Sequence, residues 1–452
     1  MNTSETTDAV NVTKLVENTG STPPLFSVLS RSFGWAGGAR AVSSVGNTAR
    51  YWLFARMLTP YDFGVTTMAL LTVDMLWAIT SASFDKALVQ QEEEIEPFLD
   101  TVWTTTLARG ALIAVLLLVA ARPIAGFFRQ EEAYIVFVAV APLALVRAFQ
   151  SPAWVSLFRR LEFHVVLMLN SAELICSVAV GVLAIRRWGD WRGLVAATIA
   201  GQIGRTALSH WYFPYRPRMR FKPALARQMF KFGRWATGTS IAEFASQQID
   251  NFVVAHVLGP SAVGDYQMAF RIGEMPASEL AFSASLVTFP MASRLNGREK
   301  ARRRLFLYSG VAVVAAGAIY ALLILGAGPD IIQIGLGPKW LGVIPALKWL
   351  CLYGLFQGLM ILGRSFLDGL GAPEASFNVT LVRLLTLALF IYPLTKWQGL
   401  SGAAAAALFS VIVPIPVMLI LYRRAERVAA AGEKRRPFKS ADVFPSTAEL
   451  SA

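Results

Sequence analysis

The feature that most constrains this chain is a series of apolar stretches long enough to cross a lipid bilayer. A helix needs roughly 20 predominantly apolar residues to span the hydrocarbon core. Uncharged runs extend from Leu305 to Pro329 and, over a shorter stretch, from Ala111 to Ala121. Because lipid offers no hydrogen-bond partners, the backbone groups of such segments must pair within the segment, as they do in a helix. The sequence therefore predicts an all-α integral membrane protein.

Composition points to the same fold class. Of the 452 residues, 55% are hydrophobic and 16% are charged, whereas a soluble domain carries about a quarter charged residues. The net charge of +13 gathers in short loops and in the tail after Tyr422, so we expect contact with lipid headgroups and no nucleic-acid partner. The three histidines lack metal-ligand spacing, and the sequence has no phosphate-binding loop or nucleophile motif. We therefore expect no metal, no cofactor and no enzymatic activity.

About twelve transmembrane helices are predicted, with Pro, Gly and charged residues at most of their boundaries. The spans of the first half are expected at 33–57, 64–82, 98–121, 132–150, 164–185 and 192–213, and those of the second half at 232–257, 265–289, 305–326, 341–363, 376–395 and 399–421. These spans define two six-helix lobes, 26–215 and 232–422. Residues 1–25 are expected to form a disordered tail, 216–231 a basic linker and 423–452 a basic tail. Lys and Arg concentrate on the side of the N-terminus, so both termini are predicted to be cytoplasmic.

An internal repeat of about 200 residues relates the two lobes. The segment Leu58-Thr59-Pro60 through Gly64 reappears as Leu258-Gly259-Pro260 through Gly264, and Asp74 then lines up with Glu274. Because each repeat holds an even number of helices, both halves insert in the same sense. The lobes should therefore be related by an axis along the membrane normal, with a substrate path between them.

The first span carries a hydrophilic stripe at spacings of three and four, formed by Arg40, Ser43, Asn47 and Arg50. Charges within a span are costly, so the stripe predicts the wall of a water-filled cavity. Arg40, Asn47 and Arg50 are therefore candidates for substrate binding, because a guanidinium can engage two phosphate oxygens at once. The alternative is that the arginines extend to the lipid headgroups.

The equivalent helix of the second half has the opposite character, with Glu243, Gln247 and Asp250 on its polar face. Asp250 occupies the position that Arg50 has in the first half. Either the two side chains pair across the lobe interface, or Asp250 binds a coupling proton or cation.

Asp74 and Glu274 occupy equivalent places in the second and eighth spans. Arg271 precedes Glu274 by three residues, a spacing that favours a local salt bridge. The candidates for ion coupling or gating are thus Asp74, Glu243, Gln247, Asp250, Arg271 and Glu274. Further charges within or near the spans are Arg147, Glu173, Arg205, Arg364 and Arg383. Arginines outnumber acids among these further charges, which favours an anionic substrate.

Several turn and packing motifs carry a resemblance to a known family. They are Leu58–Gly64, Leu258–Gly264, Asp265–Arg271, Phe289–Leu295 and Leu370–Pro373. The chain, from about residue 25 to 422, resembles the polysaccharide transporters and oligosaccharide flippases of the multidrug/oligosaccharidyl-lipid/polysaccharide exporter superfamily. The resemblance implies two lobes in a V shape, alternating access and a cationic central cavity.

The resemblance also implies a function. It points to movement of an undecaprenyl-diphosphate-linked oligosaccharide across the bacterial inner membrane during capsule, exopolysaccharide or O-antigen synthesis, with a polymerase and other polysaccharide-assembly proteins as possible partners. The acidic face that includes Glu243 and Asp250 departs from a purely cationic cavity. A cation-coupled multidrug exporter of the same superfamily is the nearest alternative. A membrane polysaccharide polymerase is the second, although the expected outer loops are short for such an enzyme.

Overall fold

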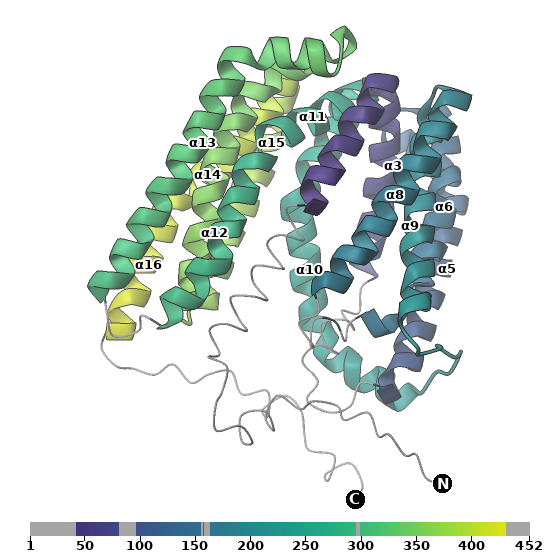
Figure 1. The fold of residues 1–452 in the computed structure, drawn as a ribbon, viewed down its shortest axis with the longest axis horizontal. Helices are drawn as coiled ribbons and strands as arrows, with labels where there is room; N and C mark the ends of the chain where they lie inside the picture. The colour runs from purple at the N-terminus through teal and green to yellow at the C-terminus, as the bar shows by residue number, and fades with distance from the viewer. Residues whose placement is uncertain (1–41, 81–95, 155–156, 158–162, 295–298, 431–452) are drawn as a thin grey trace, which may run out of the picture.

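The computed structural model describes residues 42–80, 96–154, 157, 163–294 and 299–430, and all regular secondary structure among them is helical (Figure 1). The first half comprises a helix over 42–57, α3 (Pro60–Ile79), α5 (Glu96–Phe127), η1 (Glu131–Ala133), α6 (Tyr134–Ala148), η2 (Pro152–Trp154), α8 (Phe163–Trp188) and α9 (Trp191–Tyr212). The second half comprises α10 (Pro223–Leu258), α11 (Pro260–Gly273), α12 (Met275–Arg294), α13 (Glu299–Gly335), η3 (Pro338–Val343), α14 (Ile344–Gly369), α15 (Pro373–Ile412) and α16 (Pro414–Ala430).

Each of the twelve expected spans overlaps helical residues of the structure. Among the described residues, 6 helical segments are long and apolar enough by themselves to cross a membrane. The all-α membrane fold is thus confirmed. The first span is described only from residue 42 onward, so Arg40 lies outside the described residues.

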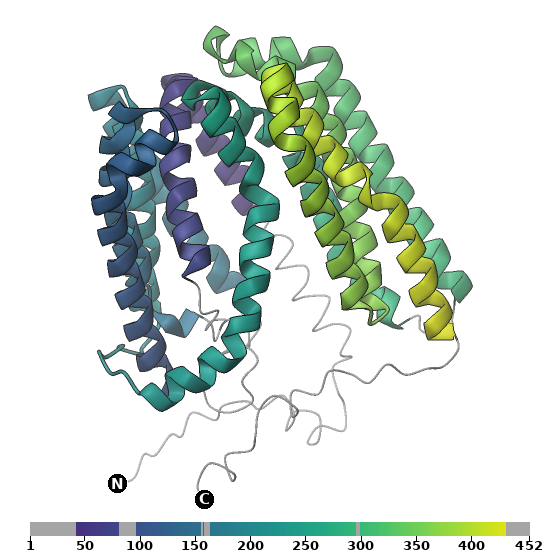
Figure 2. The same ribbon diagram turned by 180° about the vertical axis from the view of Figure 1, so that it is seen from behind.

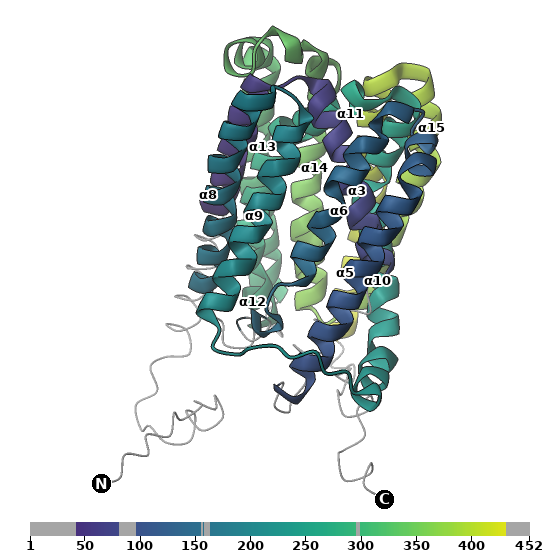
Figure 3. The same ribbon diagram turned by 90° about the vertical axis from the view of Figure 1, so that its right-hand side faces the viewer.

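Several predicted boundaries differ from the structure; α16, for example, continues to Ala430, past the expected start of the tail at 423. The linker differs as well. The linker was expected to continue to residue 231, but α10 already begins at Pro223. Proline is favoured in the first turn of a helix because its fixed φ is helical and its missing N–H is not needed there. The preceding segment runs from α9 to α10 past the start of α5 (Figure 3), where the Arg218 N–H donates to Asp100 at 2.9 Å and the Arg220 N–H donates to Thr104 at 3.1 Å.

Two helix breaks explain why helices and spans do not correspond one to one. α15 contains the eleventh span and the first part of the twelfth, which continues in α16. The two spans meet at Gly399 with φ 60° and ψ −135°, a conformation available to glycine and strained for other residues. The eighth span is divided into α11 and α12 just before Pro276. Pro276 has no N–H for the carbonyl of Ile272, and the Tyr320 hydroxyl donates to that carbonyl instead. In lipid such a replacement is needed, because a freed backbone carbonyl has no water partner.

The helices form two groups that meet at one end and separate toward the other (Figures 1 and 2). Within the first group, α8 packs on α9 and α5 on α6; within the second, α14 packs on α12, α13 and α15. α10 contacts both groups, since it packs on α15 and also on α3 and α5. The two groups are joined at what we term the closed end, where α3 packs along α11.

Reciprocal glycines allow the close approach of α3 and α11. A Cβ on Gly64 would collide with the carbonyl of Pro260, and a Cβ on Gly264 would collide with the carbonyl of Pro60. The sequence repeat is therefore also a structural repeat: the same turn from each half packs against its own counterpart. Small residues at a crossing let two transmembrane backbones approach closely, which strengthens their packing.

A second set of reciprocal contacts closes the same end. Beyond α13, the Trp340 indole donates to the carbonyl of Ala55 at 2.8 Å, and its ring lies edge-on to Phe63 with centroids 5.3 Å apart. At the end of α5, the carbonyl of Phe127 is hydrogen-bonded to His256 of α10 at 2.8 Å. The end of the third span of each half thus caps the end of the first span of the other half.

We predict that Gly64→Ala or Gly264→Ala forces α3 and α11 apart and destabilises the protein by about 1–3 kcal/mol, the usual cost of overpacking a close contact. A lower midpoint of thermal unfolding in detergent measures the effect. Gly126→Ala is the matched control, because a Cβ there meets nothing within 4 Å. Equal midpoints for all three variants would contradict a tight seam at the closed end.

Tyr320→Phe should destabilise the protein by about 1 kcal/mol, because the carbonyl of Ile272 then loses its only replacement donor among the described residues. The thermal midpoint checks this expectation. Tyr308→Phe, at an exposed position on the same helix, makes the same chemical change without a comparable bond and should leave the midpoint unchanged. A comparable loss in both variants would rule out a specific role for the Tyr320 hydroxyl.

Candidate functional site

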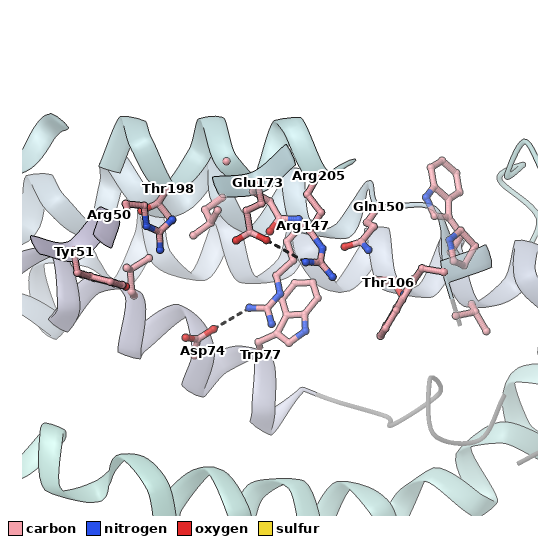
Figure 4. A pocket seen from close by; sticks show the side chains of 18 residues that line it. Arg50, Tyr51, Asp74, Trp77, Thr106, Arg147, Gln150, Glu173, Thr198 and Arg205 are labelled. Atoms are coloured by element: carbon pink, nitrogen blue, oxygen red, sulfur yellow. Dashed lines mark hydrogen bonds and ion pairs between the residues drawn. The ribbon is translucent and has the colours of Figure 1, made fainter. Parts of the chain in front are cut away.

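A polar cavity of about 610 Å³ lies within the first group of helices (Figure 4). Arg50 and Tyr51 lie at one end of it, Asp74, Arg147, Glu173 and Arg205 lie in its middle, and aromatic and amide side chains lie toward the other end. The complete lining is Arg50, Tyr51, Leu70, Asp74, Trp77, Val102, Trp103, Thr106, Leu143, Arg147, Gln150, Pro152, Trp154, Glu173, Thr198, Gly201, Gln202 and Arg205.

Two of the three arginines in this cavity are paired with carboxylates. Arg147 donates to Asp74 at 2.8 Å, and Arg205 lies 3.1 Å from Glu173 (Figure 4). The side chains of Arg147 and Asp74 are 40% and 51% exposed, so this pair faces an open cavity rather than a sealed core. Paired charges are locally compensated and contribute little net field for an anion.

Arg50 differs from the other two, because no carboxylate pairs with it among the described residues. Its guanidinium donates to the Ser177 hydroxyl at 2.9 Å and lies 5.1 Å from the centre of the Tyr51 ring. Both partners are neutral side chains, so the positive charge of Arg50 is not neutralised. It is the uncompensated cation of the cavity and the best-placed donor for an anionic group.

The packing of α8 on α9 positions the Glu173–Arg205 pair. Small residues on α9 let the two helices approach closely: a Cβ on Gly201 would lie 2.9 Å from the carbonyl of Glu173, and Gly193 lies against Ile185 in the same way. Arg205 also donates to Asn170 at 2.6 Å, which fixes its side chain along α8.

The polar stripe of the first span lies mostly against α8. The Asn47 amide donates to the carbonyl of Ser43 at 2.9 Å within its own helix, and the Asn170 amide lies 3.5 Å from the Ser43 hydroxyl. Asn47 lines none of the cavities described here, whereas Arg50 does. The structure therefore brings one residue of the stripe, Arg50, into the cavity.

A second polar cavity, of about 330 Å³, lies within the second group of helices and is lined by Asp250 and Glu274. Asp250 is buried at 4% exposure. One of its oxygens accepts from the Tyr266 hydroxyl at 3.0 Å, and the other accepts from the Asn251 N–H at 2.8 Å. The pairing of Arg50 with Asp250 is therefore wrong: each faces the cavity of its own group of helices, although the two positions are equivalent in the repeat.

The local salt bridge between Arg271 and Glu274 is also wrong, since the described residues contain no ion pair between them. The spacing argument assumed a continuous helix, but the helix is interrupted at Glu274. The Arg271 guanidinium lies 3.2 Å from the centre of the Tyr51 ring in the other group of helices. Arg271 is thus a cation–π contact between the two groups, and Glu274 faces the second cavity.

The remaining predicted residues lie in adjoining pockets. Gln247 lines the second cavity and two neighbouring pockets of about 270 and 340 Å³, and Glu243 lines the first of these two. Arg364 and Arg383 line the second cavity and the 270 Å³ pocket, and Arg383 donates to the Tyr353 hydroxyl at 2.9 Å. Carboxylates and guanidinium groups are therefore mixed in this half.

Sequence reasoning missed the aromatic and hydroxyl partners of these charges. Tyr51 lies between Arg50 and Arg271, and Trp77 lies beneath both Arg109 and Arg147, at 4.2 and 4.9 Å from the guanidinium carbons. One missed pair had a usable signal. Glu173 and Arg205 lie equally far in sequence from the turn at Gly189, so an antiparallel hairpin of α8 and α9 places them side by side.

An apolar groove of about 850 Å³ lies between the helix at 42–57 and α12. Val45 and Trp52 line one side and Pro276 and Leu280 the other, with Arg271 at the edge. The groove thus adjoins the cation–π contact between Tyr51 and Arg271. An apolar surface beside a polar cavity suits an amphiphilic molecule better than a wholly soluble one.

The fold and these cavities define a two-lobed membrane transporter. The sequence model described as "Polysaccharide biosynthesis protein" matches residues 53–345, and the chain belongs to this family. It is 21% identical over 375 residues to the lipopolysaccharide biosynthesis protein WzxC of Escherichia coli (strain K12), covering 82% of this chain and 75% of that protein. It is 29% identical over 340 residues to the succinoglycan biosynthesis transport protein ExoT of Rhizobium meliloti (strain 1021), covering 73% of this chain and 67% of that protein.

Solved structures support the fold. The lipid II flippase MurJ in an inward closed conformation superposes with a TM-score of 0.71 at 14% identity, covering 88% of this chain and 90% of that chain. An inward-facing multidrug resistance transporter of the MATE family superposes with a TM-score of 0.64 at 15% identity, covering 87% and 96%. At this identity the likeness concerns the fold alone, and it supports the all-α membrane fold expected from the sequence.

We predict that Arg50→Gln weakens binding of inorganic pyrophosphate to the detergent-solubilised protein tenfold or more, because a charge-assisted hydrogen bond contributes about 1.5–3 kcal/mol. Isothermal titration calorimetry measures the affinity. Arg192→Gln is the control, since Arg192 lies outside the cavity and is 58% exposed. Unchanged affinity in Arg50→Gln would show that Arg50 is not the anion-binding group.

Proposed function

We propose that this protein moves a lipid-diphosphate-linked oligosaccharide across the bacterial inner membrane by alternating access between two lobes, 26–215 and 232–422. The observation that carries the proposal is Arg50, an uncompensated guanidinium in a polar cavity. A diphosphate is a compact dianion that a guanidinium can bind through two oxygens. Family membership supports the same function, because WzxC and ExoT are named for lipopolysaccharide biosynthesis and succinoglycan biosynthesis transport.

The apolar groove between the helix at 42–57 and α12 supports a lipid-linked substrate. A polyprenyl chain can remain in apolar surroundings along this groove while its diphosphate reaches Arg50 and Arg271 at the adjoining cavities. Burying the chain and solvating the headgroup in separate compartments avoids the cost of carrying charge through lipid.

We further propose that the open end of the molecule faces the cytoplasm. The segment 213–222 lies at this end, and its Arg216, Arg218, Arg220 and Lys222 side chains are exposed. Basic loops favour the cytoplasmic side, so this orientation gives an inward-facing state that receives a substrate made inside the cell. Polymerase and other assembly proteins would then act on the substrate after transport.

Energy for the cycle is proposed to come from a proton or cation bound in the second lobe. Asp250 and Glu274 line its polar cavity, and Glu243 and Gln247 lie in an adjoining pocket. Asp74 and Arg271 are proposed as gating groups, since Asp74 pairs with Arg147 and Arg271 contacts Tyr51 across the lobes. Arg40 and Asn47 remain proposed substrate contacts.

A cation-coupled multidrug exporter is the second candidate, favoured by the carboxylates in the second lobe. The same superfamily fold serves such exporters, as the MATE structure shows for that protein. An uncompensated arginine disfavours a cationic drug, and family membership points to polysaccharide biosynthesis.

The proposal predicts that deleting the gene in its native host abolishes surface polysaccharide and leaves lipid-linked oligosaccharide on the cytoplasmic face. Polymer is measured by composition analysis, and the lipid-linked precursor by enzymatic labelling of inverted and right-side-out vesicles. Wild-type protein should restore the polymer, whereas Arg50→Ala should not. Arg192→Gln serves as the expression-matched control. Normal polymer together with new sensitivity to cationic drugs would instead identify the exporter.

A further inference from the structure

A chain of side-chain amides lines the 340 Å³ pocket of the second lobe. The Gln267 amide of α11 donates to the Asn251 carbonyl oxygen at 2.7 Å, and the Asn251 amide donates to Gln248 at 2.9 Å. Gln247 also lines the pocket from α10, and its side-chain amide makes no hydrogen bond within the described part of the chain. Gln247 and Gln248 also line the cavity of Asp250, but the side-chain hydrogen bonds between the amides do not include the Asp250 carboxylate.

Residues that line the pocket keep side-chain groups without partners in the described part of the chain. Among the described residues, the Gln248 amide nitrogen and the Gln267 carbonyl oxygen have none. An unpaired amide presents a donor and an acceptor together. A second observation lies in the adjoining cavity, where the Gln357 carbonyl oxygen is buried without a partner. Buried polar groups are normally paired, so the Gln357 oxygen lacks a partner that it would be expected to have. The Gln248 and Gln267 groups are half-buried and can bond a ligand or water.

The pocket adjoins the proposed phosphate-binding region. Arg271 lines both the amide pocket and the apolar groove, and its guanidinium contacts Tyr51, which lines the cavity of Arg50. A molecule whose lipid chain lies in the groove and whose diphosphate lies near Arg50 and Arg271 therefore places its next chemical group at the amides.

We propose that Gln247, Gln248, Asn251 and Gln267 form a subsite for the sugar attached to the diphosphate, and that this sugar is neutral. The inference rests on the proposed transport of a lipid-diphosphate-linked oligosaccharide. Sugar hydroxyls both donate and accept hydrogen bonds, which matches side-chain amides better than it matches charged groups. Phe270, in the same pocket, supplies an apolar surface for a sugar ring.

Charge in the pocket selects against acidic sugars. Glu274 and Glu279 line it together with a single guanidinium, that of Arg271. Because the proposed function assigns Arg271 to the diphosphate, a uronic acid carboxylate at the amides would meet two carboxylates and a cation that the diphosphate already binds. Like charges at short range disfavour binding.

The test uses the full chain in lipid nanodiscs and three probes that compete with a fluorescent polyprenyl diphosphate. The probes are polyprenyl diphosphate without sugar, with one neutral hexose and with one hexuronic acid. Wild type should bind the hexose probe about tenfold more tightly than the other two, as expected for two or three additional hydrogen bonds. Gln248→Met and Gln267→Met should each lose most of this preference while binding the sugar-free probe as wild type does.

Gln398→Met is the matched control, because it makes the same change at an exposed position outside the pocket; it should keep the full preference. Thermal midpoints of all variants establish that they are folded. Equal binding of the three probes by wild type, or equal loss for sugar-free and hexose probes in the pocket variants, would overturn the sugar subsite alone. The proposed function is overturned instead if wild type binds none of the three probes and Arg50→Gln gives the same result as wild type.

Discussion

The rest of the structure depends on the backbone contact between α3 and α11. Gly64 and Gly264 each face the other turn's proline carbonyl, and no larger side chain fits at either position. This contact joins the two groups of helices at the closed end, and the groups separate toward the other end (Figure 2). The Trp340 and His256 contacts reinforce the same end, so opening it requires the separation of several paired groups at once.

Backbone hydrogen bonding in lipid explains the positions at which this scaffold is irregular. Pro276 removes one donor, and Tyr320 replaces it from α13. Gly399 permits two spans to follow each other with almost no loop. The first irregularity lies next to Arg271 and Glu274, at the junction of the apolar groove and the polar pockets. A break in a transmembrane helix is tolerated where the freed groups are satisfied or line a cavity. At this break the carbonyl of Ile272 is satisfied by Tyr320, and Glu274 lines the polar pockets.

The fold could be predicted from the sequence because apolar length and the repeat around Gly64 and Gly264 are properties of the chain alone. The cavity position of Arg50 was also predictable, since a charge in a span must face a polar region. Pairing was not. The Arg271–Glu274 bridge assumed an unbroken helix, and an Arg50–Asp250 pair assumed that equivalent positions face each other. Which side chains meet depends on helix rotation and on breaks, which spacing along one helix does not encode.

Duplication followed by divergence of the inner faces accounts for the different chemistry of the two halves. The contact between α3 and α11 retains the same turn on both sides, since a change in either glycine collides with the other backbone. Arg50 and Asp250 occupy equivalent positions, yet each is satisfied within its own lobe, by Ser177 and by Tyr266 respectively. A substitution at either position therefore alters one cavity without disturbing the seam. Under the proposed function, this separation would let one lobe bind the anionic part of an amphiphile while the other carries amides and carboxylates for its neutral part.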